Sequence, residues 1–383
     1  MTDTKTATNI DGECATPFAS VAKAFETNFI EHGDIGASFC VYQHGEKVVD
    51  LWGGHADAAR TRPWKSDTLV NVWSTTKGMM ALCVARLADQ GRLDVDRPVA
   101  DYWPEFAANG KGQITVAQMF SHQAGLCGPE TEISKELLLD TDGLGAMLAS
   151  QKPQWTPGER SGYHALSIGQ LGDGLFKHAI GKTVGEYFRE EIAQPCGVDF
   201  HIGLPVSEES RVAEIVHDGN PQAGGAENYN EYEKRAIQNA PLSPYLANER
   251  AWRAQGTPSA AGQGNARSVA TVYSALSTDR RLNGIELVSE EALNRATTIQ
   301  IENEDLVLKL PMSWGIGFGI NKLMGIYGTN PKSFGHHGWG GSFGFADPDK
   351  GLGVAYTMNY MREPVDAPDP RLMALIQAVF TSL

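Results

Sequence analysis

The chain is 383 residues long, 42% of its residues are hydrophobic, and its formal charge is −14 at pH 7. This length allows a large core in one big domain or in two unequal ones. The acidic balance repels nucleic acid and anionic membrane surfaces, which are therefore excluded as partners. No run of eighteen apolar residues occurs, so no membrane-spanning segment is expected.

The N-terminus and the cysteines bear on where the protein works. The first nine residues are polar and carry no apolar signal region, which predicts a cytoplasmic protein. Five cysteines are scattered without a C-x-x-C pair, and their odd number predicts reduced, mostly buried thiols. No zinc or redox site is indicated, so we expect neither a metal nor a cofactor, and the sequence does not indicate the oligomeric state.

The first predicted elements are a helix and a hairpin. Apolar residues recur at helical spacing over residues 17–31, which predicts an amphipathic helix. Residues 36–42 and 48–52 flank a short polar turn and predict two neighbouring antiparallel strands. Residues 63–72 then run extended toward a serine.

That serine is Ser74, in the stretch Val72-Trp73-Ser74-Thr75-Thr76-Lys77-Gly78. Residues three apart lie on one face of a helix, so Lys77 can reach the Ser74 hydroxyl. A backbone N–H in the first helical turn has no partner inside the helix, and it can stabilise a developing negative charge. We therefore interpret Ser74 as a nucleophile and its N–H as half of an oxyanion hole. The alternative is a helix-capping serine followed by a solvated lysine.

The segment after Ser74 favours the catalytic interpretation. Apolar residues cover most of its surface as far as Gly91, which predicts a buried helix that ends at a glycine cap. A buried helix would hold a nucleophile rigidly. Two histidines are weaker candidates: His55 lies alone beside a glycine pair, and His122 is either a catalytic base or a loop residue that hydrogen-bonds the backbone.

Tyr163 ends a glycine-bracketed turn before a helix predicted to run to about His178. A cationic Lys77 within about 4–6 Å would favour the phenolate and lower the pKa of Tyr163 from about 10. Tyr163 would then accept the proton of Ser74. Residues 205–262 are polar and weakly periodic, and we interpret them as a lid or substrate loop, with Trp252 near its end.

The C-terminal part carries a glycine-dense segment over residues 334–348, which includes His336 and His337. Glycines in a strand mark places where a ligand or another backbone approaches closely, so this segment suits the lining of a substrate cleft. A strand is predicted over residues 352–358, and helices over 268–276, 289–296 and 371–380. The two ends of the chain therefore build one domain, and its middle an inserted one.

Three motifs stand in one order along the chain: Ser74-x-x-Lys77, then Tyr163-His164-Ala165, then His336-His337-Gly338-Trp339-Gly340-Gly341. Together they resemble the class C β-lactamase-related serine hydrolases, and most closely their esterase branch, the family VIII carboxylesterases. The likeness extends from about Phe18 to the C-terminus.

The resemblance implies an α+β fold like that of β-lactamases and penicillin-binding proteins. In this α/β sandwich, an antiparallel sheet from N- and C-terminal strands is flanked by helices. Residues 17–90 and 265–383 would form the sheet-containing domain. Residues 91–264 would form a mostly helical domain with substrate-covering loops.

The resemblance also implies roles for single residues. Ser74 would be the acylated nucleophile, Lys77 would lower its pKa, and Tyr163 would be the general base. Trp339 would supply the second oxyanion N–H beside that of Ser74. The implied reaction is the cleavage of a small-molecule ester through an acyl-enzyme. The candidates for substrate binding are His336, His337, Gly338, Gly340 and Trp252.

Two positions depart from the β-lactamase pattern. The asparagine expected two places after Tyr163 is Ala165, and the lysine of Lys-Thr-Gly is His336. Two groups that hold a β-lactam are therefore missing, which predicts weak or no β-lactam hydrolysis.

Several alternatives remain open. Gly340-Gly341-Ser342-Phe343-Gly344 spells the G-x-S-x-G elbow of α/β-hydrolases, but that fold places its histidine after the serine, and no histidine follows His337. The same catalytic groups would also serve an amidase or peptidase, or an acyltransferase. A catalytically silent member that binds a ligand is the alternative from another class of function.

Overall fold

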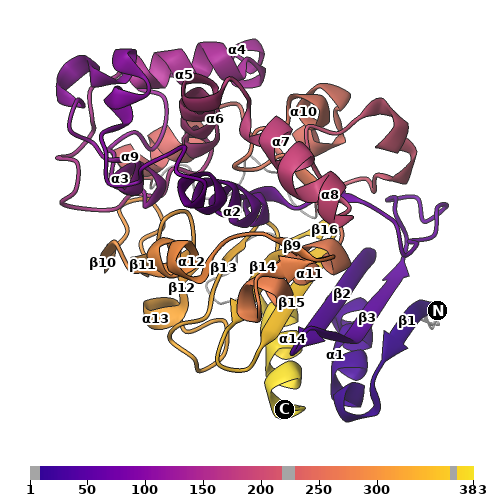
Figure 1. The fold of residues 1–383 in the computed structure, drawn as a ribbon. Coiled ribbons are helices and arrows are strands. Elements are labelled where there is room, and N and C mark those ends of the chain that lie inside the picture. The colour runs from indigo at the N-terminus through magenta and orange to yellow at the C-terminus, as the bar shows by residue number, and fades with distance from the viewer. Residues whose placement is uncertain (1–8, 218–228, 363–368) are drawn as a thin grey trace.

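The computed structural model describes residues 9–217, 229–362 and 369–383, and Figure 1 shows it as a ribbon. Nine strands of this described chain form one antiparallel sheet, in which β2 joins the N-terminal strands to the C-terminal β15. In spatial order the strands are β1 (Ile10–Cys14), β3 (Glu46–Gly54), β2 (Gly36–Gln43), β15 (Leu352–Met358), β14 (Phe343–Asp347), β13 (Phe334–His337), β12 (Gly319–Ile320), β11 (Pro311–Trp314) and β10 (Ile301–Glu304).

The helices lie on both faces of this sheet and in a group above it in Figure 1. In chain order they are α1 (Ala19–Glu31), α2 (Thr76–Asp89), α3 (Val116–Phe120), α4 (Lys135–Leu139), α5 (Thr141–Ser150), α6 (Ser167–Ile180), α7 (Val184–Phe188), α8 (Gln194–Cys196), α9 (Glu231–Glu233), α10 (Arg250–Gln255), α11 (Ala266–Ser277), α12 (Glu290–Thr297), α13 (Asn321–Met324) and α14 (Pro370–Thr381). Smaller strand groups are β4 (Val70–Asn71) with β7 (Gly262–Gly264) and β5 (Phe200–Ile202), β16 (Tyr360–Met361) with β6 (Val216–His217), and β8 (Arg281–Leu282) with β9 (Ile285–Glu286).

Different helices cover the two faces of the sheet. Gly353 of β15 lies against α11, where a side chain would meet the backbone of Ser274. Three residues on, the Tyr356 hydroxyl donates to Asp34, which is paired with the fully buried Arg371 of α14. Because alternate residues of a strand face opposite sides, α11 covers one face, and α14 with its neighbour α1 covers the other.

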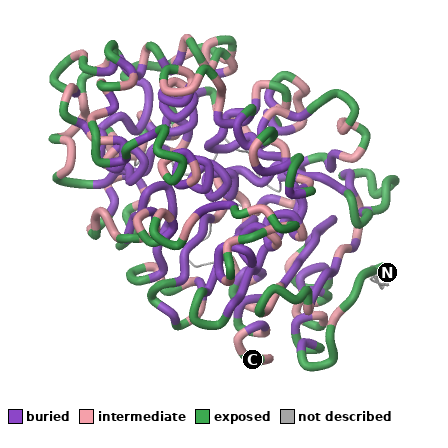
Figure 2. The backbone as a smooth tube through the Cα atoms, in the orientation of Figure 1, coloured by how far each residue is buried: buried purple, intermediate pink, exposed green. Residues whose placement is uncertain are grey.

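Helix α2 forms the centre of the molecule. Eleven of its fourteen residues are buried, and Figure 2 shows that buried segments continue from the sheet through this region into the upper helices. Full burial of one leucine, such as Leu82, contributes about 1.5–3 kcal/mol. The helix ends before Gly91, which has a left-handed φ of 67°. A helix packed on all sides gives its first turn a fixed position.

The structure confirms the predicted fold class, since an antiparallel sheet of N- and C-terminal strands is flanked by helices. Four of the five cysteines are buried, which confirms the prediction of mostly buried thiols. The sequence analysis missed β1 and β10, because these short strands are largely polar and partly exposed, and it also missed the short strands β11 and β12. The domain boundaries at residues 90/91 and 264/265 stay predictions.

The segment interpreted as a lid, residues 205–262, contains α9 and α10 as well as loops. Its residues 218–228 lie outside the described part of the chain. Among the residues that are described, no helix has both the length and the apolar character needed to cross a lipid bilayer.

Candidate active site

The turn that carries Ser74 is fixed on both sides by hydrogen bonds. The Val72 N–H donates to Gly262 O at 3.0 Å, and the Thr76 hydroxyl donates to Trp73 O at 2.5 Å. Between them, Trp73 has a left-handed φ of 46°, a conformation that costs a non-glycine residue on the order of 1–3 kcal/mol. Ser74 is partly exposed while its neighbours are buried. The strained turn therefore presents one hydroxyl on a rigid segment.

The amine of Lys77 is enclosed by three oxygen atoms. Its Nζ lies 2.9 Å from Ser74 Oγ, 2.7 Å from Ala165 O and 2.8 Å from Ser259 O. The side chain is buried, and because burial disfavours the charged form, the pKa of Lys77 is held well below its ordinary value. The structure thus brings Lys77 onto the Ser74 hydroxyl and makes its amine easy to deprotonate.

Tyr163 completes the group around Ser74. Its ring centroid lies 4.8 Å from Lys77 Nζ, and the ring stacks on Trp314 with centroids 5.7 Å apart. Burial raises the pKa of Tyr163, and a side-chain hydrogen bond with Ser74 opposes this only in part. The direction is opposite to the one expected from the sequence, because desolvation of the phenol is the largest cause and the charge of Asp305 acts in the same direction. Burial therefore favours the neutral phenol of Tyr163 over the phenolate expected from the sequence.

Three consecutive amides fix the loop of Tyr163. Gly162 N donates to His122 O at 3.1 Å, Tyr163 N to Asp305 Oδ1 at 2.8 Å, and His164 N to His122 Nδ1 at 3.2 Å. His122 is buried, and burial holds its pKa well below the ordinary value, so its ring is neutral. His122 thus holds the loop by hydrogen-bonding its backbone, which is the second of its two predicted roles.

Asp305 supports Tyr163 and was missed by sequence reasoning. Its buried carboxylate accepts hydrogen bonds from Tyr163 N, from Ser161 Oγ at 2.8 Å and from Trp314 Nε1 at 3.2 Å. It also accepts from two amides of its own loop, at 3.0 and 3.1 Å. One carboxylate therefore fixes both the Tyr163 backbone and the ring on which Tyr163 stacks. No motif marks this aspartate, because its partners are distant in sequence.

His336 and His337 end strand β13. The His336 ring centroid lies 6.0 Å from that of Tyr163, its Nδ1 bonds His337 O at 3.0 Å, and its buried Nε2 has no hydrogen-bond partner among the described residues. Burial, and then the charge of Lys77, holds the pKa of His336 well below its ordinary value. His337 Nδ1 lies 2.6 Å from Tyr327 Oη, and burial lowers the pKa of His337 to about 4. Both rings are therefore neutral at pH 7.

Trp339 lies in the turn after β13, beside the turn of Ser74. Its ring centroid is 5.0 Å from that of Trp73. Within the described chain, the backbone N–H groups of Ser74 and Trp339 donate to no other protein group. Trp339 and its neighbours Gly338 and Gly340 are partly exposed, as is Ser74. Two free amides on adjacent segments are candidates for an oxyanion hole, whose donors must both reach the developing oxyanion.

The remaining candidates lie behind or away from this group. Trp252 is fully buried and its ring centroid lies 5.7 Å from that of Trp73. Ser342, the rival nucleophile, is 1% exposed, and its hydroxyl donates to Val72 O at 2.8 Å. Ser342 therefore lacks both the access and the general base that a nucleophile needs. His55 forms an isolated β-bridge at the end of the hairpin.

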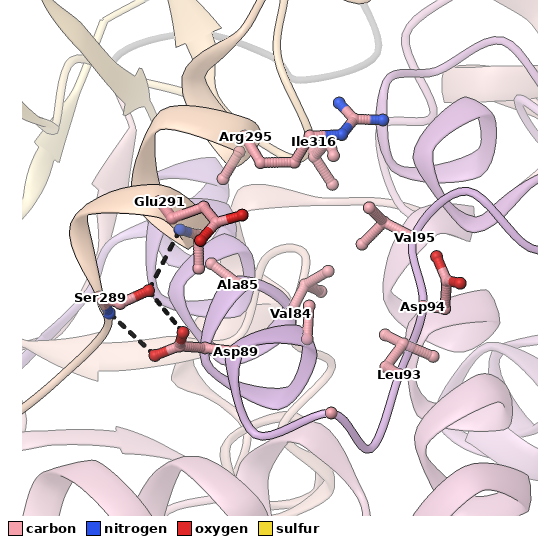
Figure 3. A pocket seen from close by; sticks show the side chains of 14 residues that line it. Val84, Ala85, Asp89, Leu93, Asp94, Val95, Ser289, Glu291, Arg295 and Ile316 are labelled. Carbon is pink, nitrogen blue, oxygen red and sulfur yellow. Dashed lines mark hydrogen bonds between the residues drawn. The ribbon is translucent and has the colours of Figure 1, made fainter.

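A separate hollow lies at the other end of α2, next to α12 (Figure 3). Apolar side chains such as Val84 and Ile316 line it together with Asp89 and Arg295. The Asp89 carboxylate accepts a hydrogen bond from Ser289 N at 2.8 Å, which joins the two helices. None of the predicted site residues lines this hollow.

Comparisons with known proteins show the family and the fold of the chain. The family model described as Beta-lactamase matches residues 21–378. The esterase/beta-lactamase LipL of Mycobacterium tuberculosis is 35% identical over 368 residues, which cover 91% of this chain and 82% of LipL. Two solved structures each superpose with a TM-score of 0.91 and cover 98% of this chain and 100% of their own: a family VIII carboxylesterase, 45% identical, and a penicillin-binding protein homolog from Caulobacter crescentus, 41% identical.

Proposed function

The chain belongs to the Beta-lactamase family, and from this premise we propose that it is a serine carboxylesterase of the family's esterase branch, with Ser74 as nucleophile. The observation that carries the proposal is the environment of Lys77. Its Nζ touches the Ser74 hydroxyl at 2.9 Å and two backbone carbonyls at 2.7 and 2.8 Å. The names of the similar esterases support carboxylic esters as the substrate class.

The three contacts of Lys77 favour it as the base that activates Ser74. A neutral amine has two hydrogens and one lone pair. The carbonyl oxygens of Ala165 and Ser259 can only accept, so they take both hydrogens. The ammonium form of Lys77 donates to Ser74 Oγ. Once the amine is neutral, its lone pair is left to face the Ser74 hydroxyl and accepts its proton as Ser74 Oγ attacks the ester carbonyl.

Tyr163 acts in this proposal as a neutral proton relay. When the tetrahedral intermediate collapses, the phenol donates its proton to the leaving alkoxide and takes one from the Lys77 ammonium, so the proton of Ser74 ends on the released alcohol. The free N–H groups of Ser74 and Trp339 bind the oxyanion, and one such donor contributes about 2.7–4 kcal/mol to transition-state stabilisation. Water then hydrolyses the acyl-enzyme by the same steps in reverse.

Gly338 and Gly340 are partly exposed, and we assign them to the rim of the acyl site. His336 is buried, and we assign its Nε2, which has no hydrogen-bond partner among the described residues, to the polar wall of the site. His337 would act beside it, and Trp252 would act on the substrate through Trp73, which it backs. Since Ala165 and His336 stand where β-lactamases have asparagine and lysine, weak or no β-lactam hydrolysis is part of the proposal.

The compartment is also part of the proposal. All five cysteines are free and four are buried, which supports a reducing compartment such as the cytoplasm.

Ser74→Ala tests the nucleophile. The serine is partly exposed and small, so the variant is expected to keep the fold and lose p-nitrophenyl ester turnover and fluorophosphonate labelling. Circular dichroism and thermal unfolding check the fold. Wild-type turnover in a folded Ser74→Ala variant would refute the proposal, and a wild-type protein that resists the probe would favour a silent binding member.

The products formed distinguish ester hydrolysis, amide cleavage and acyl transfer from one another. A panel of short- and medium-chain esters, one amide and added alcohol or amine acceptors distinguishes them. Predominant release of free acid from esters supports the esterase, and acyl transfer to the acceptor in preference to water would favour the acyltransferase.

A further inference from the structure

We propose that Ser342 is a positioning residue that braces the two halves of the oxyanion hole against each other. This inference rests on the proposed function, because it assigns the hole to the amides of Ser74 and Trp339. Ser342 belongs to the G-x-S-x-G spelling, yet it is buried and away from solvent. Its contacts assign that serine a different task.

The side chain of Ser342 holds the turn of the nucleophile. Its hydroxyl donates to Val72 O at 2.8 Å and lies 3.0 Å from Thr75 Oγ1. Since the hydrogen of Ser342 goes to a carbonyl, the Thr75 hydroxyl is the donor in the second bond. Val72 and Thr75 lie on either side of Ser74, so the bonds fix the segment that carries the first oxyanion amide.

The backbone of Ser342 holds the turn of the second amide. Ser342 O accepts from Gly338 N at 2.7 Å, and Gly341 N donates to Gly338 O at 3.2 Å. Trp339 lies inside this turn. One residue therefore bonds the segments of both amides, through its side chain on one and its backbone on the other.

The close approach of the two segments depends on Gly338. A Cβ on Gly338 would lie 2.2 Å from Val72 O and 2.3 Å from Ser342 Oγ, far inside contact distance. The absence of a side chain thus lets the turn of Trp339 rest directly on the turn of Ser74. This independent observation locates the brace where Val72, Gly338 and Ser342 meet.

The far side of the turn is also fixed. Gly340 has a left-handed φ of 87°, and its carbonyl accepts from Arg371 Nη2 at 2.7 Å. Arg371 is fully buried and paired with Asp34 and Asp369. The turn of Trp339 is therefore held by Arg371 on one side and by the backbone of Ser342 on the other. Loss of the Ser342 hydroxyl breaks only the bonds to the turn of Ser74.

The brace matters because oxyanion donors act only when they meet the developing charge at about 2.7–3.1 Å. The loss of a whole donor lowers kcat about 10²- to 10³-fold. Loosening one donor costs less, so Ser342→Ala is expected to lower kcat about 10- to 100-fold with little change in KM. The Ser342→Thr variant keeps the hydroxyl and is expected to recover part of the rate.

The matched control is Ser333→Ala. Ser333 is fully buried and immediately precedes β13, and its hydroxyl has no hydrogen-bond partner among the described residues. Ser333→Ala thus removes a buried serine hydroxyl, as Ser342→Ala does, but it breaks no hydrogen bond. This control is expected to keep wild-type kcat, and it accounts for any general effect of truncating a buried serine.

A thionoester separates positioning from stability. Sulfur accepts hydrogen bonds poorly, so an intact hole prefers the p-nitrophenyl ester over its C=S analogue. We expect Ser342→Ala to lower this preference at least several-fold, and Ser333→Ala to leave it unchanged. If Ser342→Ala does not fold, Thr75→Val removes the other bond of the brace and is expected to lower the preference likewise.

The outcomes separate this inference from the proposed function. A folded Ser342→Ala variant with wild-type kcat and wild-type ester preference overturns the brace and leaves Ser74 as nucleophile. Loss of fluorophosphonate labelling in Ser342→Ala, with labelling retained in Ser74→Ala, would overturn both, since Ser342 would then be the nucleophile. A reduced ester preference with Ser74 still labelled supports the brace.

Discussion

Asp305 Oδ1 accepts the backbone N–H of Tyr163 at 2.8 Å, across 142 positions of sequence. The same carboxylate binds Trp314 Nε1, so the stacked rings of Tyr163 and Trp314 share one anchor. A phenol that relays protons must keep a fixed distance to its partners. Asp305 therefore fixes the distance from Tyr163 to its partners in the folded protein.

Replacement of Asp305 by asparagine should therefore affect both stability and rate. Hydrogen bonds to a charged group contribute about 1.5–3 kcal/mol each, and we expect the unfolding free energy to fall by at least that amount. We also expect kcat to fall more than KM changes, because Tyr163 loses its fixed position. Urea unfolding and ester kinetics measure the two effects. Glu304→Gln changes the exposed neighbouring residue and should leave both the unfolding free energy and kcat unchanged.

The pH dependence of turnover tests Lys77 as the base. The pKa of Lys77 is held well below its ordinary value by burial, and activity needs the neutral amine. Activity should rise with pH through this lowered pKa. The pKa of Tyr163 is raised by burial, so no loss of activity from phenol ionisation is expected near pH 10. A profile of kcat/KM from pH 5 to 10.5 should show the rising limb and no falling limb.

The variant Lys77→Arg tests the same role of Lys77 as the base. Arginine stays charged throughout the range, so it cannot accept the proton, and we expect turnover to fall about 10²- to 10⁴-fold, the usual contribution of acid–base catalysis. The rising limb should also vanish. A Lys77→Arg enzyme with an unchanged profile would show that another group takes the proton of Ser74.

Stability should fall in acid because of His164. Burial lowers the pKa of His164 to about 4, below the value of about 6.5 in an unfolded chain. Between these pH values the unfolded chain binds one more proton than the folded chain. The contribution of His164 to the unfolding free energy is therefore complete above pH 6.5 and is lost as pH falls toward 4. The loss amounts to about 3 kcal/mol. Urea unfolding at pH 7.5, 5.5 and 4.5 measures it, and His164→Asn should give a shallower slope.

The neutral ring of His336 predicts which substrates are disfavoured. Its pKa is lowered by burial, so it offers no cation to a substrate carboxylate. We expect a chromogenic cephalosporin to be cleaved with a much lower kcat/KM than p-nitrophenyl acetate. His336→Lys should shift this ratio toward the cephalosporin about 10-fold, since a charged hydrogen bond contributes about 1.5–3 kcal/mol. An unchanged ratio in a folded variant would remove His336 from the acyl site.

The sequence by itself determined the local features and the family. The spacing of Ser74 and Lys77, the helix that ends before Gly91 and the order of the three motifs all follow from neighbouring residues, and the motifs identified the family correctly. Hydrophobic patterning also predicted α1, α14 and the central strands β2, β3 and β15, although it missed strands at the edges of the sheet. These features depend on contacts within one or two turns, which a sequence displays directly.

Only the tertiary structure decided the protonation states and the supports of the site. Two of the three oxygens that enclose Lys77 come from positions 88 and 182 residues away, and the burial of Tyr163 reversed the expected direction of its pKa. Ser342 reaches Val72 across 270 positions. The physical reason is desolvation and long-range packing: which groups lose water, and which carbonyl or carboxylate meets them, is settled only when distant segments pack together.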